Sequence, residues 1–136
     1  MALGESAKRS TTDIIEELRA NAEHRFTPPD MGPEAPLGDI IIHGQDIRRP
    51  LGLEREIPES RATAVLDMMA NKKGKFARPS GAIADLRFEA TDAEWSSGTG
   101  PTVSGPAEAL IMSMSGRAAA LDDLGGDGLS EFRSRF

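Results

Sequence analysis

The segment Leu37-Gly-Asp-Ile-Ile-Ile-His-Gly-Gln-Asp-Ile-Arg-Arg-Pro-Leu-Gly-Leu53 is the one around which the rest of the chain is organised. It predicts a single helix over about residues 37–49. Pro36 precedes this helix, and Pro50 and Gly52 follow it. These residues mark its ends because proline lacks a backbone N–H and glycine adopts left-handed turns without strain.

A polar stripe runs along this predicted helix. At about 3.6 residues per turn, Asp39, His43 and Asp46 fall on one side of it. Isoleucines border the stripe and widen the apolar arc: Ile40, Ile41, Ile42 and Ile47. A carboxylate and an imidazole one turn apart can converge on one divalent metal ion. The isoleucines would keep water and competing donors away from that ion, so Asp39 and His43 are candidate metal ligands.

Each residue of the stripe also has a purely structural interpretation. His43 can be a core histidine with satisfied hydrogen bonds, and Asp39 can charge the first turn, where the helix dipole favours an acid. Asp46 can accept the imidazole N–H of His43 and so fix its tautomer, or it can pair with Arg49 at the end of the helix. Spacing alone leaves these alternatives open.

The same residues carry a resemblance to a known family. Asp-Ile-Ile-Ile-His-Gly-Gln-Asp-Ile-Arg-Arg-Pro-Leu-Gly resembles the motif of the mycothiol-dependent maleylpyruvate isomerase family. The C-terminal half is similar too, in segments that follow the order of the family: Leu-Arg-Phe-Glu-Ala-Thr-Asp-Ala-Glu-Trp, Gly98, Gly100-Pro101, Val103-Ser-Gly-Pro-Ala-Glu-Ala-Leu and Gly116-Arg117. The resemblance implies a DinB-like helical metal-binding domain followed by a small, sterol-carrier-like α+β domain.

The resemblance also implies a site and a chemistry. Asp39 and His43 would hold a divalent metal, typically zinc, and Asp46 would orient the imidazole. The metal would lower the pKa of the thiol of mycothiol, whose thiolate adds to a substrate double bond, allows it to rotate and leaves. The family takes a third ligand, a histidine, from an earlier helix. This chain begins too late to contain that helix, so we expect an N-terminally truncated member with the third position empty.

Two arginines are candidate substrate ligands. Arg48 and Arg49 point about 100° apart on a helix, so at most one of them reaches the polar stripe. Arg48 or Arg117 would bind a substrate carboxylate through the planar guanidinium. The alternatives are a solvated last turn for Arg48 and, for Arg117, a pair with a local acid such as Asp122.

Composition limits the function classes. The chain has 136 residues, a net charge of −6, no cysteine, and only 4% aromatic residues. A nucleic-acid surface, a disulfide framework and a thiolate metal site are therefore not expected. No apolar run approaches the roughly 18 residues of a membrane span, and the N-terminal residues lack the apolar core of a signal peptide. A cytoplasmic location is the expectation.

Residues 1–73 are predicted to be helical and residues 74–81 to be a linker. A capping-box-like start at Ser10 opens a first helix that reaches about Arg25, with apolar residues at helical spacing: Ile14, Ile15, Leu18 and Ala22. Four prolines make the following connection stiff: Pro28, Pro29, Pro33 and Pro36. A third helix is predicted from Glu59 to Asn71, with one apolar face: Ala62, Val65, Leu66 and Met69.

Residues 82–136 are predicted to form a small α+β unit, because the apolar period changes from 3.6 to 2 near Asp85. A strand through Ala90, a continuation of its pattern at Ala93 and Trp95, a turn over residues 96–101 and a short return strand over residues 102–104 predict a three-strand antiparallel meander. Trp95 is expected to be a core anchor whose N–H is hydrogen-bonded. Helices are predicted after Pro106, after Arg117 and over the last eight or so residues.

Three functions follow from these patterns. The first is a mycothiol-dependent isomerase or transferase acting on a small carboxylate or a thiol adduct. The second is a truncated, non-catalytic member of the same family, because two ligands bind zinc weakly. The third is a carrier or regulatory module built on the C-terminal part. The apolar stripes of an incomplete bundle would be partly uncovered, so either the chain is a fragment or a second copy covers them in a homodimer.

Overall fold

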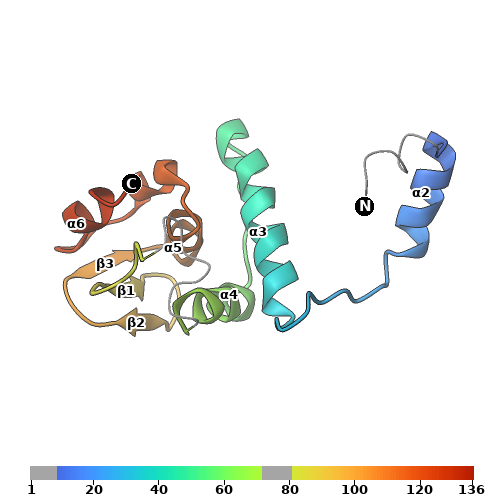
Figure 1. Ribbon diagram of the computed structural model, residues 1–136. Coiled ribbons are helices and arrows are strands. Elements are labelled where there is room, and N and C mark those ends of the chain that lie inside the picture. The colour runs from blue at the N-terminus through green and yellow to red at the C-terminus, as the bar shows by residue number, and fades with distance from the viewer. Residues whose placement is uncertain (1–8, 72–80) are drawn as a thin grey trace.

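The computed structural model describes residues 9–71 and 81–136, and it is a mixed α+β structure, as the sequence predicts (Figure 1). Residues 74–80 of the predicted linker lie outside the described residues. In chain order, the elements are α2 (Thr11–Ala20), α3 (Glu34–Arg48), η1 (Arg49–Leu51), α4 (Glu59–Asn71), β1 (Arg87–Ala90), β2 (Ser96–Gly98), β3 (Thr102–Gly105), α5 (Ala107–Met114), η2 (Ala118–Asp123) and α6 (Leu129–Arg133). Within the described ranges, no helix is both long and apolar enough to span a membrane.

The central helix α3 begins three residues earlier than predicted. Pro33 is its N-cap, and Pro36 therefore lies inside the first turn instead of in front of the helix. The first four N–H groups of a helix have no acceptor within the helix, so a proline costs no hydrogen bond there. The C-terminal end is close to the predicted one, because α3 passes into the 3-10 turn η1 and stops at Gly52, whose φ is +62°.

The sheet has the order β2-β1-β3, with β2 antiparallel and β3 parallel to β1. The prediction of an antiparallel meander is therefore wrong for β3, and residues 96–98 form the strand β2 where a turn was expected. The chain leaves β2 and crosses close to the start of β1 before it enters β3, and the N–H of Arg87 donates to the carbonyl oxygen of Pro101 at 3.0 Å.

Two glycines make this crossover possible. Gly98 and Gly100 both have positive φ, and a Cβ on either would collide with a backbone carbonyl, that of Leu86 or of Asp85. Only glycine adopts this conformation and this close approach without strain. Gly98 and Gly100, which suggested a simple hairpin turn, therefore make possible the connection that crosses from β2 to β3.

One hydrophobic core joins the parts on either side of the predicted linker. The helix α5 lies at its centre, since every residue of α5 except Glu108 is buried. The predicted apolar face of α4 is confirmed and belongs to this core, as does Ile41 of α3. Trp95 is buried as expected, and its Nε1–H donates to Asp67 of α4 at 2.9 Å. The predicted division into two domains stays a prediction, and the core is continuous across it.

The helix α2 does not share this core. Its predicted capping box is confirmed, because the side chains and backbone of Ser10 and Asp13 exchange hydrogen bonds. The helix ends at Ala20, earlier than predicted, and none of its residues is buried. Figure 1 shows α2 standing apart from the other helices, at the end of the segment that leads to α3. The expected packing of this first helix in a partial bundle is therefore not seen in the structure.

Candidate functional site

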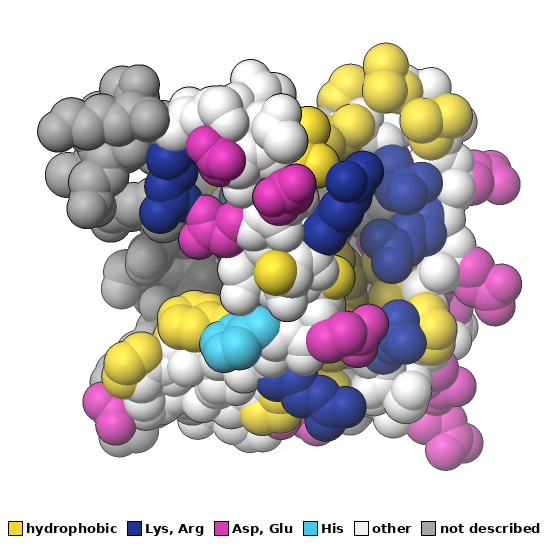
Figure 2. All heavy atoms as spheres, turned by 90° about the vertical axis from the view of Figure 1, so that its right-hand side faces the viewer, with side chains coloured by type: hydrophobic (Ala, Val, Ile, Leu, Met, Phe, Trp, Pro, Cys, Tyr) yellow, Lys and Arg dark blue, Asp and Glu magenta, His cyan; other side chains and the backbone are white. Residues whose placement is uncertain are grey.

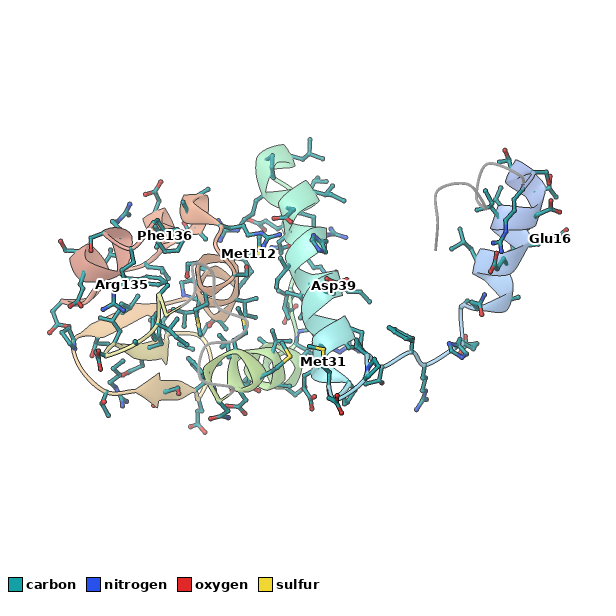
Figure 3. All side chains as sticks on the ribbon, in the orientation of Figure 1. Glu16, Met31, Asp39, Met112, Arg135 and Phe136 are labelled. Carbon is teal, nitrogen blue, oxygen red and sulfur yellow. The ribbon has the colours of Figure 1, made fainter. Side chains whose placement is uncertain are left out.

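A cavity of about 590 Å³ lies beside the N-terminal half of α3. Its walls come from the segment before α3, from α3 and α4, and from the turn after α5, and its lining includes Phe26, Met31, Asp39, Ile42, His43 and Arg117. Figure 3 shows Asp39 and Met31 on the same part of the molecule, near the start of α3. The structure thus brings three of the sequence-derived site residues, Asp39, His43 and Arg117, to one cavity although 74 positions separate His43 from Arg117 along the chain (117 − 43).

The imidazole of His43 lies between two carboxylates. Its Nε2 is 3.2 Å from Oδ1 of Asp39, and its Nδ1 is 3.2 Å from Oδ2 of Asp46. A neutral imidazole carries one N–H, so it can donate to only one of the two acids. If Nδ1–H donates to Asp46, the lone pair of Nε2 faces Asp39. If the ring is protonated, it bridges both acids as a cation.

Asp46 is fixed from the other side by Arg117. Nε of Arg117 donates to Oδ1 at 3.0 Å and Nη2 to Oδ2 at 2.7 Å, which is a bidentate pair. Nη1 donates to the carbonyl oxygen of Ser115 at 2.9 Å. These hydrogen bonds lower the pKa of Asp46 and raise that of Arg117. Asp46 therefore stays ionised as the acceptor for Nδ1–H of His43 at neutral pH.

The backbone around Gly116 places Arg117 beside Asp46. The helix α5 ends at Met114, and Gly116 follows with a φ of +91°, which turns the chain back. The N–H of Arg117 then donates to the carbonyl oxygen of Met112 at 2.9 Å, so the residue is tied to the end of the helix. Asp122, the alternative partner considered for Arg117, instead pairs with Arg133 at 2.9 Å.

The donors on α3 fit two positions of a zinc site. Two ligands at about 2.0–2.1 Å from a tetrahedral zinc are about 3.3 Å apart. The observed separation of 3.2 Å between His43 Nε2 and Asp39 Oδ1 agrees with this. The contact between Nδ1 and Asp46 is the outer carboxylate contact that ligand histidines usually make. Within residues 9–71 and 81–136, however, no three His, Cys, Asp or Glu side chains converge as a metal site.

Arg48 lies outside this cavity. It lines a shallow depression at the other end of α3, together with residues of the 52–56 segment. Of the two arginines expected to bind a substrate carboxylate, the structure thus places Arg117 at the cavity and Arg48 away from it.

A second polar cluster, which the sequence analysis missed, holds the same end of α3. Arg49 donates from Nε and Nη2 to the carboxylate of Glu108 at 2.7 and 2.5 Å, and Gln45 donates to Glu108 at 2.9 Å. Arg49 also lies 2.9 Å from Asp123. Burial raises the pKa of Glu108, but the hydrogen bonds from Arg49 and Gln45 outweigh it, so the net pKa is lowered. The available signal was Glu108 itself, the only charged residue in the apolar segment of α5.

No protein family, curated protein or solved structure matches this chain.

Proposed function

We propose that the chain is an enzyme of metal-assisted thiol chemistry that acts on a small carboxylate, of the kind that the resemblance to the mycothiol-dependent maleylpyruvate isomerase family implies. One observation carries this proposal. A metal-compatible pair, Asp39 and His43, shares a cavity with Arg117. These are two types of residue that such a reaction needs, a metal-binding pair and a cation for an anionic substrate.

Each residue of the site would have its own role. Asp39 and His43 would hold the metal, and a bound metal would lower the pKa of the thiol of mycothiol. Asp46 would accept Nδ1–H of His43, which leaves the lone pair of Nε2 for the metal. Arg117 holds Asp46 with two N–H groups and Ser115 with a third. Two of the five N–H donors of its guanidinium remain for a carboxylate.

The shape of the cavity limits the substrate. A volume of about 590 Å³ is in the range of small-molecule sites. Apolar side chains line much of it, including Phe26, Ile42, Met68 and Met69. A substrate with a carboxylate near Arg117 and a short apolar body against these residues would fit this combination.

A non-catalytic function is the second candidate, and one observation favours it. The side chains of His43 and Asp39 are 63% and 73% exposed, so water can compete for any metal bound there. Two exposed donors bind zinc much more weakly than three or four enclosed ones. Under this alternative the chain keeps the fold and has no activity.

A zinc titration of the purified chain tests the proposal. We expect one zinc per chain, lost in His43→Ala and unchanged in the matched control Asp122→Asn, whose carboxylate lies outside the cavity. With mycothiol or another low-molecular-weight thiol and a cis-unsaturated dicarboxylate, we expect zinc-dependent isomerisation that Arg117→Ala abolishes. Zinc binding that His43→Ala leaves intact would show that the site is wrongly assigned. Zinc binding without any thiol chemistry would favour the non-catalytic alternative.

A further inference from the structure

The depression at the C-terminal end of α3 has no part in the proposed function. We call it the Arg48 depression. Its volume is about 730 Å³, and its walls come from α3, from the segment 52–56 and from the residues around the start of α5. Arg49 and Glu108 also line it, but they bind each other at 2.7 and 2.5 Å and are not available to a ligand. Two arginines, the amide oxygen of a glutamine and three further acids remain.

The two arginines, Arg48 and Arg55, have no acid of their own. Arg48 lies four positions after Gly44, and Nη1 of Arg55 is 3.6 Å from where a Cβ of Gly44 would lie. Residues four apart are neighbours on a helix, so both side chains border the same part of α3. Within residues 9–71 and 81–136, neither guanidinium forms an ion pair. Like charges so placed repel each other, and a carboxylate between them would offset the repulsion through their planar N–H groups.

Gln45 supplies a buried acceptor beside these cations. Its side chain lines the depression, and the residue is only 7% exposed. Nε2 donates to Glu108 at 2.9 Å, whereas Oε1 accepts no hydrogen bond from any described residue. Buried polar atoms nearly always have a partner, because an unmade hydrogen bond costs the whole desolvation of the group. A ligand in the depression that carries an N–H group would bring the missing donor.

The acids of the depression make a simple anion a poor fit. Its lining contains three arginines and four acids. Asp92 stands at the start of α5, where Oδ1 accepts the N–H of Ala107 at 2.7 Å, and Oδ2 accepts no hydrogen bond within the described part of the chain. On the side of the molecule drawn in Figure 2, Lys and Arg side chains group in the upper right part, and Asp and Glu side chains lie along the neighbouring edge. The surface thus offers cations and acids close together.

These features exclude a ligand with only one kind of charge. A carboxylate alone would leave Oε1 of Gln45 without a donor, and an amine alone would leave Arg48 and Arg55 without an acid. A ligand that carries both groups meets both needs. Gln45 is three positions before Arg48, so the acceptor and a cation lie within one turn of α3. This spacing suits a carboxylate and an ammonium group on the same carbon atom.

We propose that the Arg48 depression binds a free α-amino acid with an apolar side chain. The carboxylate lies on Arg48 and Arg55, and the ammonium group donates to Oε1 of Gln45 and to Asp92. Leu53 and Pro106, which also line the depression, provide apolar surface for the side chain of the ligand. This site is separate from the cavity beside Asp39 and His43, and it does not depend on the proposed function.

L-leucine and its two halves test the proposal without any change to the protein. L-leucine carries both charged groups, 4-methylpentanoate lacks the ammonium group, and 3-methylbutylamine lacks the carboxylate. In calorimetric titrations of the full chain we expect one L-leucine per chain and at least about tenfold weaker binding of each half. Binding of 4-methylpentanoate as tight as that of L-leucine overturns the proposal, because the site would then recognise only an anion. No binding of L-leucine below about 10 mM overturns it as well.

Substitutions then place the binding in the Arg48 depression. Arg48→Ala and Arg55→Ala should each weaken L-leucine binding about tenfold or more. The matched control is Arg61→Ala, because Arg61 is an exposed arginine of α4 that lies outside the depression, and it should change nothing. Loss of L-leucine binding in Arg117→Ala and not in Arg48→Ala would put the amino acid in the other cavity and overturn the proposal.

Gln45→Met tests the part of the amide oxygen. This variant loses a donor to Glu108 and can be less stable, so the readout is a ratio of affinities measured on folded chain. The preference for L-leucine over 4-methylpentanoate should disappear in Gln45→Met. In Arg55→Ala, which leaves Gln45 and Glu108 untouched, both affinities should fall and the preference should remain. An unchanged preference in Gln45→Met would show that Oε1 does not receive the ammonium group and would overturn the proposed mode of binding.

Discussion

Two polar clusters connect α3 to the C-terminal half of the molecule, and they differ in how well their charges are satisfied. The Arg49 cluster consists of Gln45, Arg49, Glu108 and Asp123, and the His43 cluster of Asp39, His43, Asp46 and Arg117. The side chains of Arg49 and Glu108 are 27% and 22% exposed. Those of His43 and Asp39 are largely open to solvent.

The difference separates a structural cluster from a candidate functional one. In the Arg49 cluster, the carboxylate of Glu108 accepts one hydrogen bond from Gln45 of α3 and two from Arg49 of η1, and Arg49 contacts a second acid as well. In the His43 cluster, the imidazole has two acids and at most one proton to share when it is neutral, and it borders a cavity. The second cluster holds the metal-compatible pair, Asp39 and His43, whereas the first lines the depression at the other end of α3 and leaves Oε1 of Gln45 without a hydrogen-bond partner among the described residues. Substitutions in the Arg49 cluster should therefore lower the free energy of unfolding, and substitutions in the His43 cluster should weaken ligand binding at the cavity.

The largest effect is expected from Glu108→Ala. The substitution leaves Arg49 and Gln45 without their shared acceptor at the contact between α3 and α5, and loss of one partner of a largely buried pair costs about 3 kcal/mol. We expect the free energy of unfolding to fall by about that amount in urea titrations that follow Trp95 fluorescence. Zinc affinity per folded chain should stay within about threefold, because Glu108 does not line the cavity.

Glu89→Ala is the matched control for this change. Glu89 is exposed, and its only ion pair within the described residues is a long one to Arg87, 3.4 Å, so the cost should stay below about 0.5 kcal/mol. Equal losses in the two variants would mean that the Arg49 cluster does not hold α3 in place.

Asp46→Asn should show the reverse pattern. The amide cannot hold both Arg117 and the imidazole as an ionised carboxylate does, and loss of such an outer contact typically lowers metal affinity about 10- to 100-fold. The stability cost should be only about 1 kcal/mol, because both side chains of the pair with Arg117 are about one-third exposed and solvent screens them. Zinc titration and urea denaturation of the same preparation measure both quantities. A loss of stability without a loss of zinc affinity would mean that the His43 cluster is structural, like the Arg49 cluster.

Low pH should reduce the stability that both clusters contribute to the fold. The pKa values of Asp46 and Glu108 are lowered on folding, from ordinary values of 3.8 and 4.5. A carboxyl whose folded pKa is lowered contributes stability that is fully present above its unfolded pKa and is lost as the pH falls through the folded one. We expect constant stability from these groups between about pH 6 and 8 and a decline below about pH 4.5. In Glu108→Gln the decline should be shallower, which thermal unfolding across this pH range measures. An unchanged slope would contradict the assignment.

The sequence predicted the elements whose causes are local. The capping box at Ser10 and the buried face of α4 follow from a few neighbouring residues, and both are confirmed. The direction of β3 depends on the crossing of two backbones at Gly98 and Gly100, and short-range patterns do not report such a contact. In the same way, the periodicity of α2 predicted a helix but not its lack of a covering surface.

In the candidate site, too, the contacts between near neighbours in sequence were predictable and those between distant residues were not. The contacts of His43 with Asp39 and Asp46 join residues three and four positions apart on one helix, so spacing alone anticipates them. The pair between Asp46 and Arg117 spans 71 positions, and only the resemblance suggested that Arg117 lies near the site. Glu108 has no helical spacing to Arg49 at all, which is why the second cluster was missed.

The smallest effect is expected from Arg48→Ala, and it sharpens the comparison between the two ends of α3. Arg48 has no ion-pair partner within the described part of the chain and does not line the cavity, so its loss should change the free energy of unfolding by less than about 0.5 kcal/mol. Zinc affinity and binding of a small dicarboxylate should be unchanged, whereas Arg117→Ala should weaken carboxylate binding about tenfold or more. Calorimetric titration of both variants with zinc and with the dicarboxylate measures these affinities. Carboxylate binding that depends on Arg48 and not on Arg117 would move the substrate site to the depression at the other end of α3.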